Sequence, residues 1–337
     1  MTAMSEEDKA FLEAVMKEGI IDENERMKVI LKQVTETMEK WKTSSFTKEE
    51  EDSTEELLQE LRDIVEQIDY ARAFAAMKGL VFLLGCAGER ERMPKSTRML
   101  CLGILATLSQ HNPPVQKELL ELGSVKTLSD LYFVEDEQSN EDSDGQLRAR
   151  ILQAISAIVR SNELAEAVFC QVDQAVSLLE AGIGKSKNNV PDVVCKRTLF
   201  FLRALITSDF TTRDRVRQFS SCIEHVIDCF LLSQLTTTQA SAELTEMALT
   251  LIEQILQQKK SVNAILERKD SLVSLGSQRV EALRNMEGEE KEYAQVELEL
   301  WLQILALLER TTPDVDDPAS APLMIQDGTA ETTEMPQ

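Results

Sequence analysis

The sequence is poor in the residues that form turns and sheets. Its 337 residues include only 12 glycines and 8 prolines, and aromatic side chains make up 5% of the chain. Leu, Ala, Glu and Gln occur throughout. Because this composition favours helices over strands, we expect an all-α protein.

Positive charge is also scarce. The chain has 36 Lys and Arg residues against 59 Asp and Glu residues, which gives a formal net charge of -23. Nucleic acids and anionic membranes are bound through cationic surfaces. The net charge therefore argues against both as partners, although it leaves room for a small cationic patch.

Groups that could hold a metal or perform catalysis are few. The six cysteines stand singly inside apolar runs without a CxxC pair, and the two histidines have no Cys or His at ligand spacing. We therefore expect core cysteines and no metal site. No nucleophile and base can be assembled either, so the sequence predicts no enzyme and no cofactor.

Long apolar segments are missing as well. No run of 18 apolar residues occurs, and the first residues are acidic where a secretory signal would be basic and then apolar. We expect a cytoplasmic protein with reduced thiols.

A repeat of about 50 residues organises what is present. Five long segments rich in apolar residues align with spacings between 47 and 50 residues when one apolar residue of each, here called the column residue, is superimposed. The segments are Lys95–Gln110, Gln146–Arg160, Val193–Thr207, Ala242–Gln257 and Glu292–Glu309, and the column residues are Leu108, Ile158, Leu205, Ile255 and Leu305. Each segment is apolar nearly all round, so each helix must be sandwiched between neighbours.

Two shorter helices meeting at a sharp corner, such as the one at Gly123, are expected before each long helix after the first. A unit of three helices repeated in this way is typical of an armadillo-like right-handed α-solenoid, here of about four to five repeats. We expect a helical extension and charged linker at 1–52, the repeats at 53–310 and an acidic disordered tail at 311–337. The acidic stretch 134–146 is expected to be a loop insertion.

Basic residues recur near the starts of the first three long helices. Arg98, Arg148 and Arg197 are spaced by 50 and 49 residues. These cations are either ordinary solvated surface or a ladder aimed at a partner. Residues 95–205 carry only -2, against -9 for 1–94 and -12 for 206–337. The central block is therefore the least acidic region of the chain.

Several stretches resemble the armadillo-type nucleotide-exchange factors of heat-shock protein 70, the cytosolic Hsp70-binding proteins. The most similar is Leu105–Val125 (LATLSQHNPPVQKELLELGSV), and Glu56–Phe74, Ala154–Arg160 and Glu292–Leu300 follow the family in order. The opening helix Met4–Met16 is similar too. The Gly-rich segment that many members carry near the N-terminus has no counterpart here.

This resemblance implies a monomeric co-chaperone that binds the ATPase domain of heat-shock protein 70 through its concave face and promotes ADP release, without chemistry of its own. An armadillo scaffold or adaptor for another folded protein is the alternative. The residues implied for partner binding lie on the first three long helices: Lys95, Arg98, Ala106, Gln110, Arg148, Ser156, Arg160, Arg197 and Arg203.

Overall fold

Helices make up every regular element that the structure describes. The computed structural model describes residues 22–41, 44–137, 143–184, 190–232, 241–258 and 263–311. The elements are α2 (Glu23–Trp41), α3 (Lys48–Val65), α4 (Ile68–Ala76), α5 (Gly79–Gly88), α6 (Lys95–Ser109), α7 (Pro113–Glu121), α8 (Ser124–Glu137), α9 (Gln146–Val159), α10 (Glu163–Gln171), α11 (Ala175–Gly182), α12 (Asp192–Thr207), α13 (Arg213–Gln218), α14 (Ser220–Val226), η1 (Ile227–Leu231), α15 (Ala242–Gln258), α16 (Asn263–Leu266), α17 (Lys269–Arg284) and α18 (Glu289–Arg310).

The helices after α3 follow one another in sets of three, with η1 continuing α14. In each set the third helix is the one that the sequence predicted, with ends within three residues of the predicted ones. The third helices α6, α9, α12, α15 and α18 begin between 46 and 51 residues apart. This regular succession makes the fold a helical, solenoid-like row.

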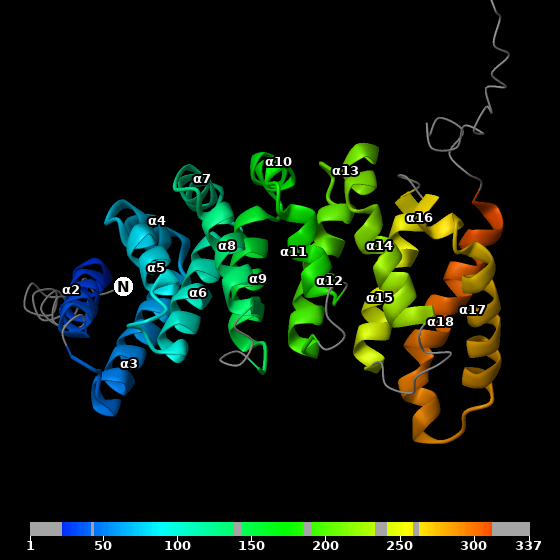
Figure 1. Cartoon of the computed structure of the whole chain (residues 1–337), viewed down its shortest axis with the longest axis horizontal. Helices are drawn as coiled ribbons and strands as arrows, with labels where there is room; N and C mark the ends of the chain where they lie inside the picture. The colour runs from blue at the N-terminus through cyan, green and yellow to red at the C-terminus, as the bar shows by residue number, and fades with distance from the viewer. Residues whose placement is uncertain are drawn as a thin grey trace, which may run out of the picture.

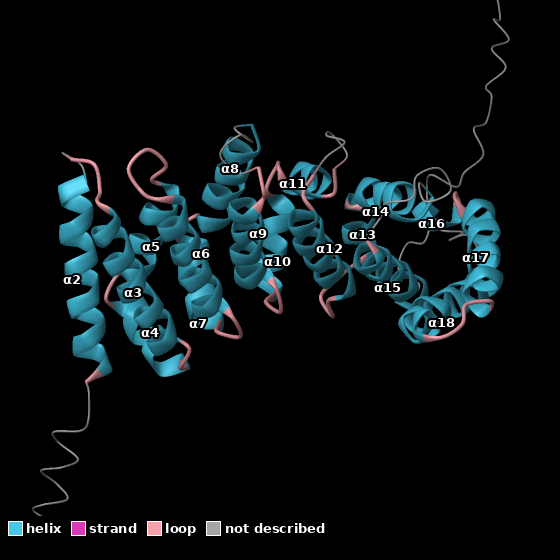
Figure 2. Ribbon diagram, turned by 90° about the horizontal axis from the view of Figure 1, so that it is seen from below, coloured by secondary structure: helices cyan, strands magenta, loops and turns pink. Residues whose placement is uncertain are grey.

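Neighbouring sets pack through their third helices. Helix α3 packs against α6, and the contact is repeated between α6 and α9, α9 and α12, α12 and α15, and α15 and α18. The first helices α4, α7, α10, α13 and α16 lie along the upper edge in Figure 1. Figure 2 shows the same row from below, from α2 at one end to α17 and α18 at the other.

The column residues form the centre of the core. Leu108, Ile158, Leu205 and Ile255 are at most 1% exposed, as the apolar character of their helices predicted. Leu305 is only partly buried. Its helix, α18, packs on α15 and α17 and is the last one that the structure describes, so no further described helix follows it in the row.

The corners between first and second helices explain two glycines. Gly123 separates α7 from α8 with φ +69°, the left-handed conformation that the sequence predicted there. At the preceding corner Lys78 takes this conformation, with φ +67°. Gly79 is required for a different reason, because a Cβ on it would lie 2.2 Å from the Phe74 ring.

Two segments expected to be irregular contain helix. Part of the expected charged linker, from Lys48 on, forms the first turns of α3. A capping box between Thr47 and Glu50 stabilises the N-terminus of this helix. The expected boundary at 52–53 therefore runs through a helix. The expected extension residues 1–21 and tail residues 312–337 lie outside the described part of the chain.

The prediction that the acidic stretch 134–146 is a loop with nothing to bury is wrong for its first residues. Its first four residues belong to the last turn of α8, and Glu135 and Asp136 are 1% and 8% exposed. Residues 138–142 lie outside the described ranges.

Across the described ranges, no single helix is long and apolar enough to cross a membrane. Helices α4 and α5, which meet at 81°, are together long and apolar enough, by length and composition alone.

Candidate partner-binding groove

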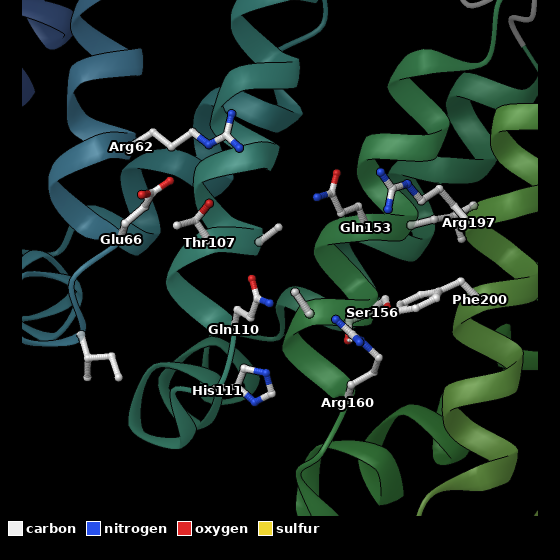
Figure 3. A pocket seen from close by; sticks show the side chains of 14 residues that line it. Arg62, Glu66, Thr107, Gln110, His111, Gln153, Ser156, Arg160, Arg197 and Phe200 are labelled. Atoms are coloured by element: carbon white, nitrogen blue, oxygen red, sulfur yellow. Dashed lines mark hydrogen bonds between the residues drawn. The ribbon is translucent and has the colours of Figure 1, made fainter.

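A hollow of about 620 Å³ opens across four successive long helices (Figure 3). Helices α3, α6, α9 and α12 each contribute side chains to it. We call it the arginine groove. Its lining consists of Arg62, Glu66, Ile68, Ala106, Thr107, Gln110, His111, Leu152, Gln153, Ser156, Ala157, Arg160, Arg197 and Phe200.

The helix ends around the groove are fixed by a buried amide. Gln116 on α7 is 2% exposed, and its Nε2 donates to the backbone oxygens of Ala157 and Arg160, each at 3.0 Å. Its Oε1 accepts from Asn162 Nδ2 at 3.1 Å. Because Arg160 follows directly after α9, these bonds hold its backbone at the rim of the groove.

Three arginines give this groove a positive charge, although the chain as a whole is acidic. In the described parts of the molecule, Arg62, Arg160 and Arg197 form no ion pair. Glu66 is the one carboxylate among the described lining residues, and it is exposed and forms no ion pair there either. The groove therefore presents a cationic surface without internal neutralisation.

The arginines lie within each other's electrostatic field. Arg150, beside the groove, donates to Gln153 Oε1 at 2.8 Å. Burial lowers its pKa, and the charges of Arg197 and Arg62 lower it further. Burial and then the charge of Arg197 likewise lower the pKa of Arg160. A bound anion would relieve this repulsion.

Apolar surface lies next to these cations. The Arg160 guanidinium stands 4.7 Å from the centroid of the Phe200 ring, and Phe200 is 38% exposed. Ile68, at the α3 side, is 49% exposed. A ligand that combines carboxylates with an apolar side chain would match both features.

Two polar groups in the groove lack hydrogen-bond partners within the described residues. They are the Ser156 hydroxyl, in a side chain that is 4% exposed, and Arg62 Nε. Buried polar atoms normally find a partner, so these two atoms are exceptions to that rule.

Five of the nine residues predicted to bind a partner line the arginine groove. They are Ala106, Gln110, Ser156, Arg160 and Arg197. The small side chains of Ala106 and Ser156 are 5% and 4% exposed and leave room for the groove. Arg203 is partly buried on α12 and does not line it.

The predicted surface position of Arg98 and Arg148 is wrong. Each is 3% exposed. Arg98 Nη2 lies 2.6 Å from Glu135 Oε1, and Arg98 Nε donates to the Ala87 oxygen at 2.9 Å. Arg148 Nη1 lies 2.7 Å from Asp136 Oδ1. Both arginines are held inside the fold by the acidic end of α8.

Lys95 also lies away from the groove. Its ammonium pairs with Asp144, 2.8 Å away, just before α9. Lys196 makes the equivalent link to Glu243 at the start of α15. These lysines connect neighbouring units at their surface.

Arg62 and Phe200 are groove residues that the sequence analysis missed. Arg62 lies on α3, before the first repeat that the apolar spacing detected, although it falls in a stretch used for the family resemblance. Phe200 was assigned to a helix apolar all round, and nothing in the spacing marks it as exposed. In the described ranges, no group of three or more His, Cys, Asp or Glu could hold a metal ion.

Comparison with solved structures supports the helical row. The crystal structure of an engineered protein matches with a TM-score of 0.54 and 15% identity, covering 83% of this chain and 96% of that chain. At this identity the likeness concerns the fold alone.

Among curated proteins, the chain is similar to Hsp70-binding protein 1 of Homo sapiens, Mus musculus and Rattus norvegicus. Each is 26% identical over 181 residues, which cover 53% of this chain and 48% of the relative. The chain thus spans about half the length of the curated relatives that it matches. No protein-family model matches the sequence.

Proposed function

We propose that this protein is a co-chaperone that binds a heat-shock protein 70 through the arginine groove. The observation that carries the choice of partner is the similarity to Hsp70-binding protein 1 over 181 residues. The groove supplies a location for the contact, because its cations have no neutralising partners in the described structure.

The kind of partner follows from the groove's chemistry. Arg62, Arg160 and Arg197 favour a surface that carries carboxylates, and Phe200 offers an apolar contact between them. Arginine forms forked hydrogen bonds with carboxylates, which gives such a contact geometric specificity. A row of packed helices keeps the backbone positions of these side chains at fixed separations. The entropy cost of ordering them on binding is therefore small.

The finer proposal is that the partner surface lies on the chaperone's ATPase domain and that binding promotes ADP release. The repeats would then be of armadillo type, in a right-handed solenoid whose concave face holds the groove. A nucleotide-exchange factor must bind the ADP-bound state more weakly than the nucleotide-free state. By linkage, ADP must weaken its binding by the same factor.

The proposal includes no chemistry by this chain. It would act as a monomer in the cytoplasm, without a cofactor, and would change only the population of chaperone states. The repeats at 53–310, extended to the start of α3, would form the binding unit.

Release of a fluorescent ADP analogue from a purified cytosolic heat-shock protein 70, followed by stopped flow, tests this function. We expect micromolar concentrations of the full chain to accelerate release at least tenfold. An unchanged rate would contradict nucleotide exchange.

The alternative is a scaffold that uses the same groove for another acidic protein. Charge complementarity alone does not identify a chaperone as the partner. The effect of ADP on binding therefore separates the two functions. Calorimetric binding to the purified chaperone should weaken on adding ADP if the chain is an exchange factor. Absence of chaperone binding would favour the scaffold.

A further inference from the structure

The arginine groove has a candidate occupant within the chain itself. Residues 312–337 contain six acidic residues and no Lys, Arg or His. The acidic residues are Asp314, Asp316, Asp317, Asp327, Glu331 and Glu334. Between the two acidic clusters stands an apolar triplet, Leu323, Met324 and Ile325. This alternation of carboxylates and apolar side chains matches a groove lined by unpaired arginines beside Phe200 and Ile68.

The segment starts close enough to reach the groove. Helix α18 ends at Arg310, and its end lies at the same edge of the row as the end of α9 (Figure 1). Three packing steps separate the two helices, through α15 and α12. At about 8–10 Å per step this is a distance of about 30 Å. Twelve extended residues, from Thr311 to Leu323, span up to about 40 Å.

We propose that the acidic segment 312–337 docks in the arginine groove and competes with the protein's partner for it. The docking is independent of the proposed function. Only its consequence, a weaker hold on the chaperone, rests on that function.

Tethering makes a weak contact sufficient. A segment joined by a short flexible linker has an effective concentration in the millimolar range. If the free segment bound with a dissociation constant of about 0.1 mM, the tethered one would occupy the groove about 90% of the time. An external acidic ligand would then bind about tenfold more weakly. The competition is therefore measurable without any change in the folded core.

A synthetic peptide of residues 312–337 with a fluorescent label, followed by anisotropy at low salt, tests the docking. The receptor is the full chain with its six tail acids replaced by amides, so that its own segment no longer competes. We expect saturable binding to this receptor and about tenfold weaker binding to the wild-type chain. Equal binding to both chains would overturn the proposal.

Variants of the same receptor locate the contact. Arg62→Gln with Arg197→Gln should weaken peptide binding at least tenfold. Arg72→Gln with Arg284→Gln removes the same charge from exposed helix positions outside the groove and should change it less than twofold. Matching thermal unfolding curves confirm that both receptors fold, and Arg197→Gln alone, expected to weaken binding about threefold, provides a second variant. Equal loss in the groove and control variants would overturn the groove as the site.

Failure of the docking can be told apart from failure of the proposed function. With chaperone, the amide-tailed chain should bind more tightly than the wild type by the factor seen with the peptide. If the peptide docks in the groove while the chaperone binds neither chain, the docking stands and the chaperone function fails. If the chaperone binds both chains equally and the peptide does not bind, the docking is overturned and the function stands.

Discussion

Arginines on the long helices serve two different regions of the molecule. Arg98 and Arg148 are buried and paired with carboxylates at the end of α8, 2.6 and 2.7 Å away. Arg150 and Arg197 lie at or beside the groove and form no ion pair with any described residue. The first pair holds a helix in place, whereas the second leaves its charge free for a ligand.

Helix geometry explains the division. Arg98 and Arg148 each stand ten residues before the column residue of their helix. Arg150 and Arg197 each stand eight residues before theirs. An offset of two residues turns a side chain by about 200° around a helix axis, which moves it to the opposite face. Two cations separated by one residue can therefore have unrelated roles.

The largest expected effect on this comparison comes from Arg98→Met. It leaves Glu135 buried with Arg90, 2.8 Å away, as its remaining cation. Removing one partner of a buried pair should lower the free energy of unfolding by about 3 kcal/mol. Urea unfolding followed by circular dichroism measures it, with the exposed Arg72→Met as control, expected within about 0.5 kcal/mol of wild type. A loss of less than about 1 kcal/mol would mean that the buried pair contributes little.

Charge reversal in the groove should weaken binding and leave stability nearly unchanged. Arg62→Glu with Arg197→Glu should weaken chaperone binding at least tenfold, because both replaced side chains line the groove. The free energy of unfolding should stay within about 0.5 kcal/mol, since neither arginine is ion-paired in the described structure. Calorimetry gives the affinity, and Arg72→Glu with Arg284→Glu is the matched control. A similar loss of affinity in the control would mean that the change in net charge, and not the groove, causes the effect.

A pH series on Glu166→Gln tests a third buried carboxylate of the paired kind. Glu166 Oε2 lies 2.5 Å from Arg215 Nη1. Burial raises the pKa of Glu166, and the Ser208 hydroxyl and Arg215 only partly oppose this. The folded state then binds the proton more tightly than the unfolded state. The stability due to Glu166 is therefore full below the ordinary glutamate pKa, about 4.3, and is lost as the pH rises through the folded pKa.

The wild type should accordingly lose stability relative to Glu166→Gln as the pH rises through this window. Urea unfolding of both chains between pH 4 and pH 8 gives the difference. A difference that moves in favour of the wild type with rising pH would show that the pairing with Arg215 outweighs burial.

The smallest expected effect is a gain of stability in the groove. Burial lowers the pKa of both Arg150 and Arg160, and Arg197→Gln removes the charge that lowers it further. Relief of this repulsion should raise the free energy of unfolding by a few tenths of a kcal/mol, on the order of an exposed charge pair. The gain should fade in 1 M salt, where charges are screened. A loss of stability would mean that Arg197 makes a stabilising contact that outweighs the repulsion.

Much of the fold was predictable from the sequence because its long helices are apolar nearly all round. The 47–50 residue spacing placed Leu108, Ile158, Leu205 and Ile255 in one buried column, and the structure confirms it. The stop at Gly123 was predictable because a left-handed residue is needed there. These features depend on local patterns that one sequence displays.

The groove was only partly predictable. Ala106, Ser156 and Arg197 were among the residues that the family resemblance implied for partner binding, and they line the groove. Arg98 and Arg148 were misplaced because a spacing of 49 residues was accepted as one repeat, although it shifts Arg197 by two residues against the column. Their partners were missed because the acidic run containing Glu135 has the composition of a solvated loop, and only tertiary packing makes it the end of a helix.

ADP release from a purified heat-shock protein 70, measured for three versions of the full chain, tests the central claim most directly. Wild type should accelerate release at least tenfold, Arg62→Glu with Arg197→Glu should lose most of that acceleration, and Arg72→Glu with Arg284→Glu should keep it. Equal acceleration by all three chains would contradict the assignment of the arginine groove as the surface that holds the chaperone.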